Sequence, residues 1–321
     1  MLEKRRVYFS GKSSFILTLP KRWATENGIE PGSEVLLNVG KNFITIYPKN
    51  SRLRAKRVEI DAKNVKHEAL LRRIISYYLA GVDSLKIRIY NEEQRGAISR
   101  ASEILMGVEI VEDTGKDVIL EIFLDYSRLK PEGIIRRMGN TCVGMISDFC
   151  SALRKYDRYI CNSIIFRERE VDKLYFLLLR QLKQANIHAD IAAELDIPIE
   201  AIQEYRTVVR AMERISDHAA NMAFNLIELG KPVESLCDFV EVDLEMLRTA
   251  MVAFLENELE LAEIVLEEFD DIQDMERKYY SDILKEDVEE ALYLKSIVDS
   301  LSRIAGYSAD IAEVVVNMVV I

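Results

Sequence analysis

Two pairs of carboxylates are spaced so that each pair would lie on one face of a helix. Glu168 and Asp172 are four residues apart, and so are Glu213 and Asp217; that spacing places two side chains on adjacent turns of the same helix face. Apolar residues share these faces, namely Cys161, Ile165, Tyr175 and Leu179 for the first pair and Ala220, Phe224 and Ile227 for the second. We expect such acids to be partly buried, and four clustered acids then require a cation or bound protons.

The chemistry that this pattern predicts is metal binding through oxygen ligands from two helices. Oxygen-only ligation suits hard ions such as Mg²⁺, Mn²⁺ or Ca²⁺, and carboxylate clusters also bind iron. The spacing alone leaves open a second interpretation, in which the acids form ordinary surface ion pairs. The arginines within reach are Arg169, Arg210 and Arg214. The Glu-x-x-His ligand pair of redox di-iron bundles is missing, since Glu213 and His218 are five residues apart.

The four acids occur in only one copy of an internal repeat. Apolar residues between positions 152 and 174 recur 101 residues later, and the segment 212–217 recurs 89 residues later. The positions equivalent to the four acids are Phe269, Gln273, Ser302 and Gly306. No carboxylate is retained there, so the sequence predicts one metal site per chain, in the first copy.

Each copy of the repeat is predicted to form three helices. In residues 198–229 the apolar side chains recur at steps of three and four, which is the period of bundle packing. We therefore expect a mainly α protein in which residues 129–230 and 231–321 form two tandem three-helix bundles. They are called the first and second bundle here, and together the helical body.

The N-terminal 50 residues, called the head, differ from the rest in charge and pattern. Residues 1–57 carry a net charge of +8, whereas residues 58–321 carry −19. Short β-rich segments alternate with turns, with one helical stretch after Pro20. A region of this size buries only a small core, so we expect help from a second copy of the chain.

The basic side chains of the head are candidates for contact with DNA. Lysine and arginine neutralise phosphates, and arginine also reads guanine edges. The candidates are Lys4, Arg5, Arg6, Lys12, Lys21 and Arg22. The alternative is a solvated basic surface. A phosphate-binding loop at Gly11-Lys12-Ser13 is rejected, because the first glycine of that motif would fall at Arg6.

Residues 51–128, called the middle module, alternate between strand and helix patterns. Strands are predicted at 57–60, 85–89, 108–111 and 118–123, with helices through 70–78 and at about 92–106. The last two strands are expected to form a hairpin across Thr114-Gly115. This order predicts a small α+β unit, and no catalytic constellation is evident in it.

The composition argues against several classes of protein. With 49% hydrophobic residues the chain is too apolar to be disordered, and no apolar run is long enough to cross a membrane. No apolar segment follows the charged start, so a secretory signal is not expected. The four cysteines form no Cys-x-x-Cys pair and are expected to be buried free thiols. We expect a cytoplasmic protein without membrane insertion.

The second acidic helix resembles the signature of a known family. Residues 213–223, Glu-Arg-Ile-Ser-Asp-His-Ala-Ala-Asn-Met-Ala, are similar to the E-R-I-x-D-H-x-x-N-I-A motif of PhoU-like phosphate-signalling proteins. The resemblance covers residues 131–321 and implies a regulator of phosphate uptake that is not an enzyme. It also implies metal binding by Glu168, Asp172, Glu213 and Asp217, with His218 and Asn221 next to the ligands. The ion, divalent or trivalent, is left open among Mg, Mn, Ca, Fe and Zn.

The head resembles the AbrB/SpoVT swapped-hairpin DNA-binding fold. The similar residues are 14–24, Ser-Phe-Ile-Leu-Thr-Leu-Pro-Lys-Arg-Trp-Ala, and 28–35, Gly-Ile-Glu-Pro-Gly-Ser-Glu-Val. In that fold two chains interleave into one barrel, which implies a homodimer. A head of this kind on a PhoU-like body resembles archaeal phosphate uptake regulators.

Three functions follow from these observations. The first is a homodimeric transcriptional regulator whose head binds operator DNA and whose body senses phosphate status. In the second, the head only dimerises and the body docks on a phosphate transporter or a sensor kinase. The third, a metal-dependent hydrolase, lacks an evident nucleophile–base pair and a histidine-rich ligand set. The sequence favours the first.

Overall fold

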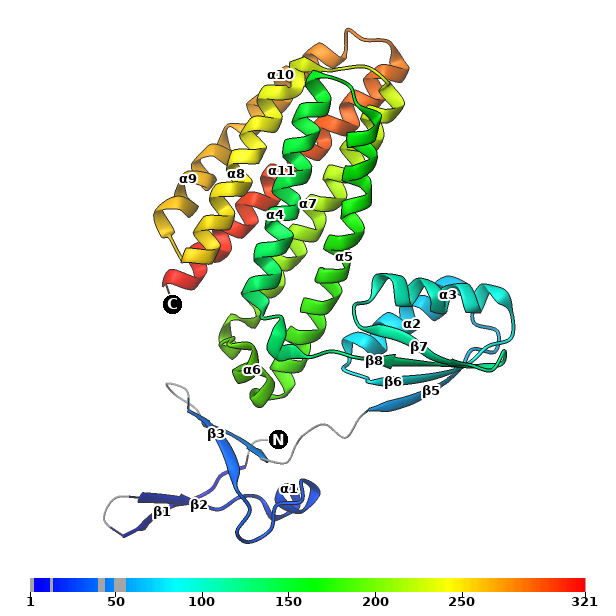
Figure 1. Ribbon diagram of the computed structural model, residues 1–321. Helices are drawn as coiled ribbons and strands as arrows, with labels where there is room; N and C mark the ends of the chain where they lie inside the picture. The colour runs from blue at the N-terminus through cyan, green and yellow to red at the C-terminus, as the bar shows by residue number, and fades with distance from the viewer. Residues whose placement is uncertain (1–2, 12–13, 40–43, 49–55, 321) are drawn as a thin grey trace.

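The computed structural model describes residues 3–11, 14–39, 44–48 and 56–320, which form a head, a middle module and a helical body (Figure 1). The strands are β1 (Val7–Ser10), β2 (Ser14–Leu17), β3 (Val35–Val39), β4 (Ile44–Pro48), β5 (Arg57–Asp61), β6 (Ser84–Arg88), β7 (Val108–Asp113) and β8 (Asp117–Ile122). The helices are α1 (Lys21–Glu26), α2 (His67–Leu79), α3 (Glu92–Ile104), α4 (Pro131–Arg154), α5 (Arg158–Ile187), α6 (Ala189–Leu195), α7 (Ile202–Leu229), α8 (Cys237–Glu256), α9 (Leu259–Asp270), α10 (Ile272–Ile283) and α11 (Val288–Val320). Single 3-10 turns lie at Tyr126–Arg128, Ile199–Ala201 and Glu234–Leu236. The predicted fold class is confirmed.

The head consists of two β-hairpins separated by α1. β1 pairs with β2 and β3 with β4, both antiparallel, and Pro20 precedes the first turn of α1. None of the head residues whose side-chain exposure the structure describes is buried. Large apolar side chains are instead exposed, including Phe9 at 69% and Phe15 at 68%. One chain therefore leaves the apolar surface of its head uncovered.

The middle module is a four-stranded sheet with two helices on one face (Figure 1). The strand order is β5-β6-β8-β7, in which β5 and β6 are parallel and the other pairs are antiparallel. Side chains on β8 alternate between buried and half-buried, as expected when helices cover one face only. The predicted order of strands and helices is confirmed.

The helical body encloses one continuous hydrophobic core that draws on both bundles. The central helix α7 packs against α5 within the first bundle and against α11 of the second, while α4 packs against α8. The single helix α5 corresponds by the repeat to two shorter helices, α9 and α10, which are divided at Asp271. All four cysteines are buried free thiols. Among the described residues, no helix is long and apolar enough to cross a membrane.

Arg180 of α5 joins the helical body to the middle module. Arg180 as a whole residue is 2% exposed. The guanidinium donates to the carbonyl oxygens of Tyr78 and Val82, to the Tyr126 hydroxyl at 2.9 Å and to the Asp83 carboxylate at 3.2 Å. It also lies over the Tyr78 ring, 5.0 Å from the ring centroid. If the module moved away from α5, the buried charge of Arg180 would lose its partners, which is unfavourable. The contact therefore stabilises the docking of the module on α5.

The close approach at this junction explains Gly81, which follows α2. A Cβ atom at Gly81 would lie 2.3 Å from Gln184 Oε1 of α5, and the residue has a positive φ of 79°. Both the φ angle and the lack of space favour glycine.

A carboxylate is buried without a partner in the second bundle. Asp243 of α8 is fully buried, and neither of its carboxylate oxygens accepts a hydrogen bond. Burial raises the pKa of Asp243 well above its ordinary value. The residue 101 positions earlier is Cys142, also fully buried, whose Sγ donates to the Met212 carbonyl at 3.5 Å. The two repeats thus place a satisfied thiol and an unsatisfied acid at equivalent positions.

We predict that Asp243→Cys raises the free energy of unfolding at pH 7 by about 1–3 kcal/mol, because it removes an unpaired buried acid. An acid whose pKa is raised by folding stabilises the protein fully only below its unfolded pKa of about 4. That contribution is lost as the pH rises towards the folded pKa. Denaturant unfolding in reducing buffer at several pH values above 4 should therefore show a declining stability in the unaltered protein and a flatter profile in the variant. Asp238→Cys, at an exposed position of α8, is the control, and a steeper loss in Asp243→Cys contradicts the prediction.

Candidate metal centre

Three of the four predicted acids come together where α5 packs against α7. Glu168 and Asp172 project from successive turns of α5, and Asp217 projects from α7. One carboxylate oxygen from each of the three lies within 4.8 Å of the other two. All three side chains are half-buried. The described residues of the chain hold no other group of three or more potential ligands at this spacing.

Glu213, the fourth acid, lies one turn before Asp217 on the same helix. Its Oε2 atom is buried and accepts no hydrogen bond, although Arg214 Nε is 3.4 Å away. Arg214 also contacts Asp217, with Nη1 3.2 Å from Oδ2. The buried oxygen of Glu213 thus has spare capacity to accept a hydrogen bond or to ligate a cation.

The pKa values of three of the clustered acids are raised, because burial and neighbouring charges disfavour their ionised forms. Burial, together with the charges of Glu168, Asp217 and Glu213, raises the pKa of Asp172 to about 7. Burial also raises the pKa values of Glu213 and Asp217, against the opposing effect of Arg214. Like charges in a half-buried space disfavour ionisation. Without a cation, the cluster therefore retains protons at pH values where isolated aspartates are ionised.

Ion pairing accounts for only part of this charge. Of the three arginines near the acids in the sequence, Arg214 pairs with Glu213 and Asp217, whereas the described residues show no ion pair for Arg169 or Arg210. Arg169 instead lies over the Phe166 ring. The charge of Arg210 also opposes the rise in the pKa of Glu213. Two arginines still leave four ionised carboxylates with a net negative charge, which requires either bound protons or a cation.

His218 and Asn221 face the second bundle. The His218 ring lies 5.9 Å from the ring of Tyr307, its equivalent in the repeat, and burial with the nearby arginine charges lowers the pKa of His218. Asn221 donates to the Ser300 and Ser296 hydroxyls of α11, at 3.0 and 3.1 Å. In the described part of the chain, neither residue hydrogen-bonds to the four acids. Their contacts stabilise the packing of α7 against α11.

The second bundle shows the same helix contact without the acids. Phe269 and Gly306, the counterparts of Glu168 and Asp217, lie against each other: a Cβ atom on Gly306 would be 3.8 Å from the Phe269 ring. Ser302, the counterpart of Glu213, has a buried hydroxyl without a partner. The contact between the two helices is therefore repeated, with uncharged residues in place of the carboxylates.

The candidate DNA contacts in the head are exposed. Arg5 pairs with Glu3, and Arg22 on α1 pairs with Glu26 at 2.8 Å. Lys4, Arg6 and Lys21 are exposed as well. Lys12 lies outside the described residues. The basic side chains described in the head are thus exposed to solvent, and two of them are already paired with acids.

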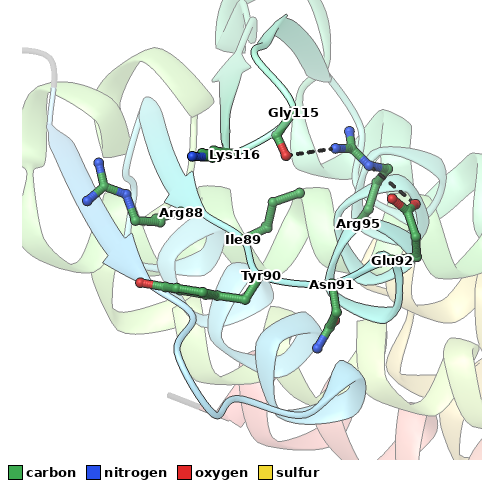
Figure 2. Close-up of a pocket in the computed structure, with 8 residues that line it drawn as sticks. All are labelled: Arg88, Ile89, Tyr90, Asn91, Glu92, Arg95, Gly115 and Lys116. Carbon is green, nitrogen blue, oxygen red and sulfur yellow. Dashed lines mark hydrogen bonds and ion pairs between the residues drawn. The ribbon is translucent and has the colours of Figure 1, made fainter.

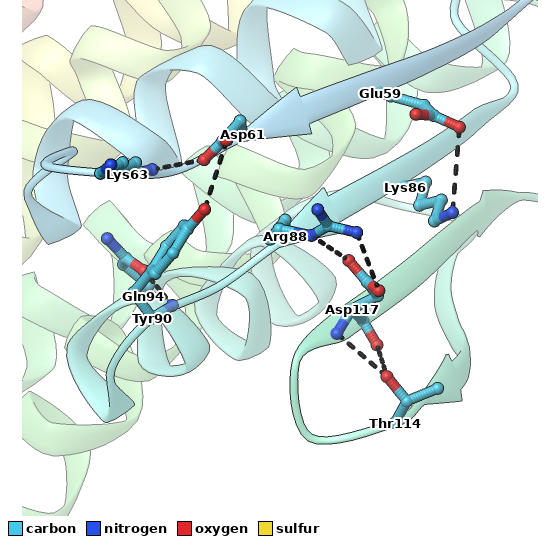
Figure 3. A network of polar contacts seen from close by, with 9 residues as sticks. All are labelled: Glu59, Asp61, Lys63, Lys86, Arg88, Tyr90, Gln94, Thr114 and Asp117. Carbon is cyan, nitrogen blue, oxygen red and sulfur yellow. Dashed lines mark hydrogen bonds and ion pairs between the residues drawn. The ribbon is translucent and has the colours of Figure 1, made fainter.

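A polar pocket in the middle module has no counterpart in the sequence predictions. It has a volume of about 410 Å³ and lies where β6 leads into α3, with Arg88, Tyr90, Arg95 and Lys116 around it (Figure 2). Arg88 pairs with Asp117 at 3.0 Å, and the Tyr90 hydroxyl donates to Asp61 at 3.3 Å (Figure 3). In the sequence, this pocket is marked only by the charged residues near the end of β6 and the turn between β7 and β8. Because most of its charges are paired within the module, the pocket gives no clear ligand preference.

Comparison with protein families covers the body and the head separately. A family model of the PhoU domain matches residues 135–226 and 236–315, together more than half of the chain. A second model, described as "Antidote-toxin recognition MazE, bacterial antitoxin", matches residues 8–54. No curated protein matches the chain.

Two solved structures share the fold of the helical body. PhoU from Pseudomonas aeruginosa is 18% identical, with a TM-score of 0.50 over 59% of this chain and 95% of its own. The phosphate transport system regulatory protein PhoU from Streptococcus pneumoniae is 20% identical, with a TM-score of 0.51 over 59% of this chain and 92% of its own. From the match to the PhoU domain across both bundles, we conclude that this chain belongs to the PhoU family.

Proposed function

We propose that this protein regulates phosphate uptake as a homodimeric, DNA-binding transcriptional regulator with a metal-binding body. The observation that carries the proposal is the fusion of a PhoU body, matched over both bundles, to a basic head that matches a MazE-type antitoxin domain. In this proposal the body senses phosphate status and the head binds DNA.

The metal in this proposal is held by the α5 and α7 acids. Glu168, Asp172 and Asp217 already lie within ligand-sharing distance, and Glu213 adds a buried oxygen without a hydrogen bond. An all-carboxylate donor set suits Mg²⁺, Mn²⁺, Ca²⁺ or iron better than Zn²⁺, which prefers nitrogen and sulfur. A bound ion would neutralise the acids and so favour close packing of α5 on α7.

The homodimer in this proposal supplies the missing core of the head. The apolar side chains of β1 and β2 are exposed in a single chain, and exposed apolar surface of this kind is normally covered by a partner. A second copy is the partner favoured here, because Leu37 and Val39 of β3 are exposed as well, so a second head would offer apolar strands to cover those of the first. Two heads in one dimer would place two basic surfaces on one DNA duplex.

A second function has one observation in its favour. Arg5 and Arg22 are already paired with Glu3 and Glu26, which reduces the positive charge available for DNA. In that case the head would only dimerise, and the body would dock on a phosphate transporter or a sensor kinase. Binding of the full chain to DNA separates the two functions.

We predict that Glu213→Gln combined with Asp217→Asn abolishes stoichiometric metal binding in elemental analysis, because it removes both α7 ligands. Metal at about 100 times its dissociation constant stabilises a folded protein by about 2.7 kcal/mol, so its addition should raise the melting temperature of the unaltered protein only. The matched control is Glu263→Gln with Glu267→Gln, an exposed pair at the same spacing on α9. Equal metal content in all three proteins would show that Glu213 and Asp217 do not bind the metal.

We predict a solution mass of twice 36.9 kDa for the full chain in light scattering. Phe15→Asp places a charge on the apolar surface of β2 and should shift the protein towards the monomer. Tyr159→Asp alters an aromatic residue on α5 that is 83% exposed, and it should leave the mass unchanged. If the unaltered chain is monomeric, the proposal that two heads form a dimer is wrong.

We predict that the full chain shifts a pool of random-sequence duplexes in a gel and enriches particular sequences from it. Affinity should fall with salt, and Lys21→Gln with Arg22→Gln should lower the slope of log K against log salt by about 0.9 for each phosphate that is no longer neutralised. Arg158→Gln with Lys183→Gln, two exposed positions of α5, should retain the slope. Absence of binding at low salt would favour the docking function instead.

A further inference from the structure

A cleft lies between the middle module and the helical body, beside the acid cluster. It has a volume of about 500 Å³, which is within the usual range of small-molecule sites, and such sites are common between structural units. α3 of the module contributes Arg100 and Ile104, and α4 contributes Arg137. The lining residues of α5 are Phe166, Arg167, Arg169, Glu170, Asp172 and Lys173. The cleft therefore exists only when the module is docked on the body.

The walls of the cleft carry more positive than negative charge. Five of the lining side chains are lysine or arginine and three are acids. Arg100 pairs with Glu103 at 3.2 Å, Arg137 pairs with Glu170 at 3.0 Å, and Arg167 pairs with Asp148. Arg169 and Lys173 are different, because the structure shows no ion pair for either among the described residues.

The two unpaired cations lie one turn apart on the same helix. Their four-residue spacing places Arg169 and Lys173 on one face of α5, and both line the cleft. Next to them, Phe166 is 68% exposed, with the Arg169 guanidinium 5.8 Å from its ring centroid. The cleft thus combines two free positive charges with an exposed aromatic ring.

We propose that this cleft binds the phosphoryl group of a small molecule on Arg169 and Lys173. A phosphate monoester carries a charge of about −1.5 to −2 at pH 7, which two unpaired cations match, whereas a monocarboxylate would neutralise only one of them. The planar guanidinium of Arg169 suits two oxygens of a tetrahedral phosphate. Inorganic phosphate and a phosphate ester share this chemistry, and Phe166 offers a ring for stacking in the second case.

Anion binding in the cleft does not depend on a bound metal. Arg169 and Lys173 belong to the cleft and not to the acid cluster, so the anion site is expected in metal-free protein. Asp172 is shared, because it lines the cleft and also belongs to the cluster. A cation held there would add positive charge to one wall and tighten anion binding.

Calorimetric titration of the full chain, treated with a chelator, tests the proposal with inorganic phosphate, AMP and adenosine as probes. Saturable binding of phosphate, AMP or both is expected, and adenosine should not bind. Binding of AMP alone identifies an ester as the ligand, and binding of phosphate alone identifies the free anion. Absence of saturable binding by either phosphoryl probe, or equal binding of adenosine, overturns the proposal.

Substitutions locate the site within the chain. Each cation removed should weaken binding about tenfold, since a charge-assisted hydrogen bond contributes roughly that factor; Arg169→Gln with Lys173→Gln should therefore weaken it about a hundredfold. Arg158→Gln with Lys183→Gln changes the charge of α5 equally outside the cleft and should bind as the unaltered protein does. Arg169→Lys retains the charge and should weaken binding less than Arg169→Gln. An equal loss in the control pair overturns the assignment, and circular dichroism confirms that each variant is folded.

Discussion

Where α5 packs against α7, carboxylates that repel one another are held close together. The same contact builds the core of the first bundle, so hydrophobic packing brings together acids that would otherwise separate. Burial and the charges of the neighbouring acids together raise the pKa of Asp172. Protons or a cation must resolve this repulsion, and the two choices differ in what they do to the helices. A proton neutralises one acid, whereas a cation attracts several acids at once and draws the two helices together.

The internal repeat provides a comparison within one molecule. At the equivalent contact of the second bundle, Phe269 lies against Gly306 and no acid is present. This contact needs no ion, because none of the four residues at the equivalent positions is charged. The first bundle has carboxylates at positions where the second bundle forms the same helix contact without any charged residue. This difference between the two copies favours a functional role for the acids more strongly than their spacing does by itself.

The sequence predicted the elements and the faces of the helices, because both depend on residues close together in the chain. The spacing of Glu168 and Asp172 and the order of strands and helices in the middle module are of this kind. The junction at Arg180 was not predicted, since its partners Tyr78 and Val82 lie about a hundred residues away and a single arginine in an amphipathic helix has no distinctive pattern. The cleft was missed for the same reason: Arg100 and Lys173 become neighbours of one cavity only after the module docks. The division between α9 and α10 also had no clear signal, because Ile272 continues the apolar pattern of the repeat.

The helix α5 contributes residues to the acid cluster, to the cleft and to the junction with the middle module. α5 presents Glu168 and Asp172 to α7, Arg169 and Lys173 to the cleft, and Arg180 to the middle module. Within its 30 residues there is no break such as the one between α9 and α10, so a displacement at one end is transmitted along a continuous helix. By thermodynamic linkage, an anion in the cleft and a cation at the cluster must strengthen each other's binding if both favour the same position of α5, and by the same factor. In the proposed homodimer, the middle module, which is anchored to α5 and follows the head directly in the chain, would be the part through which binding to the body changes the arrangement of the two heads.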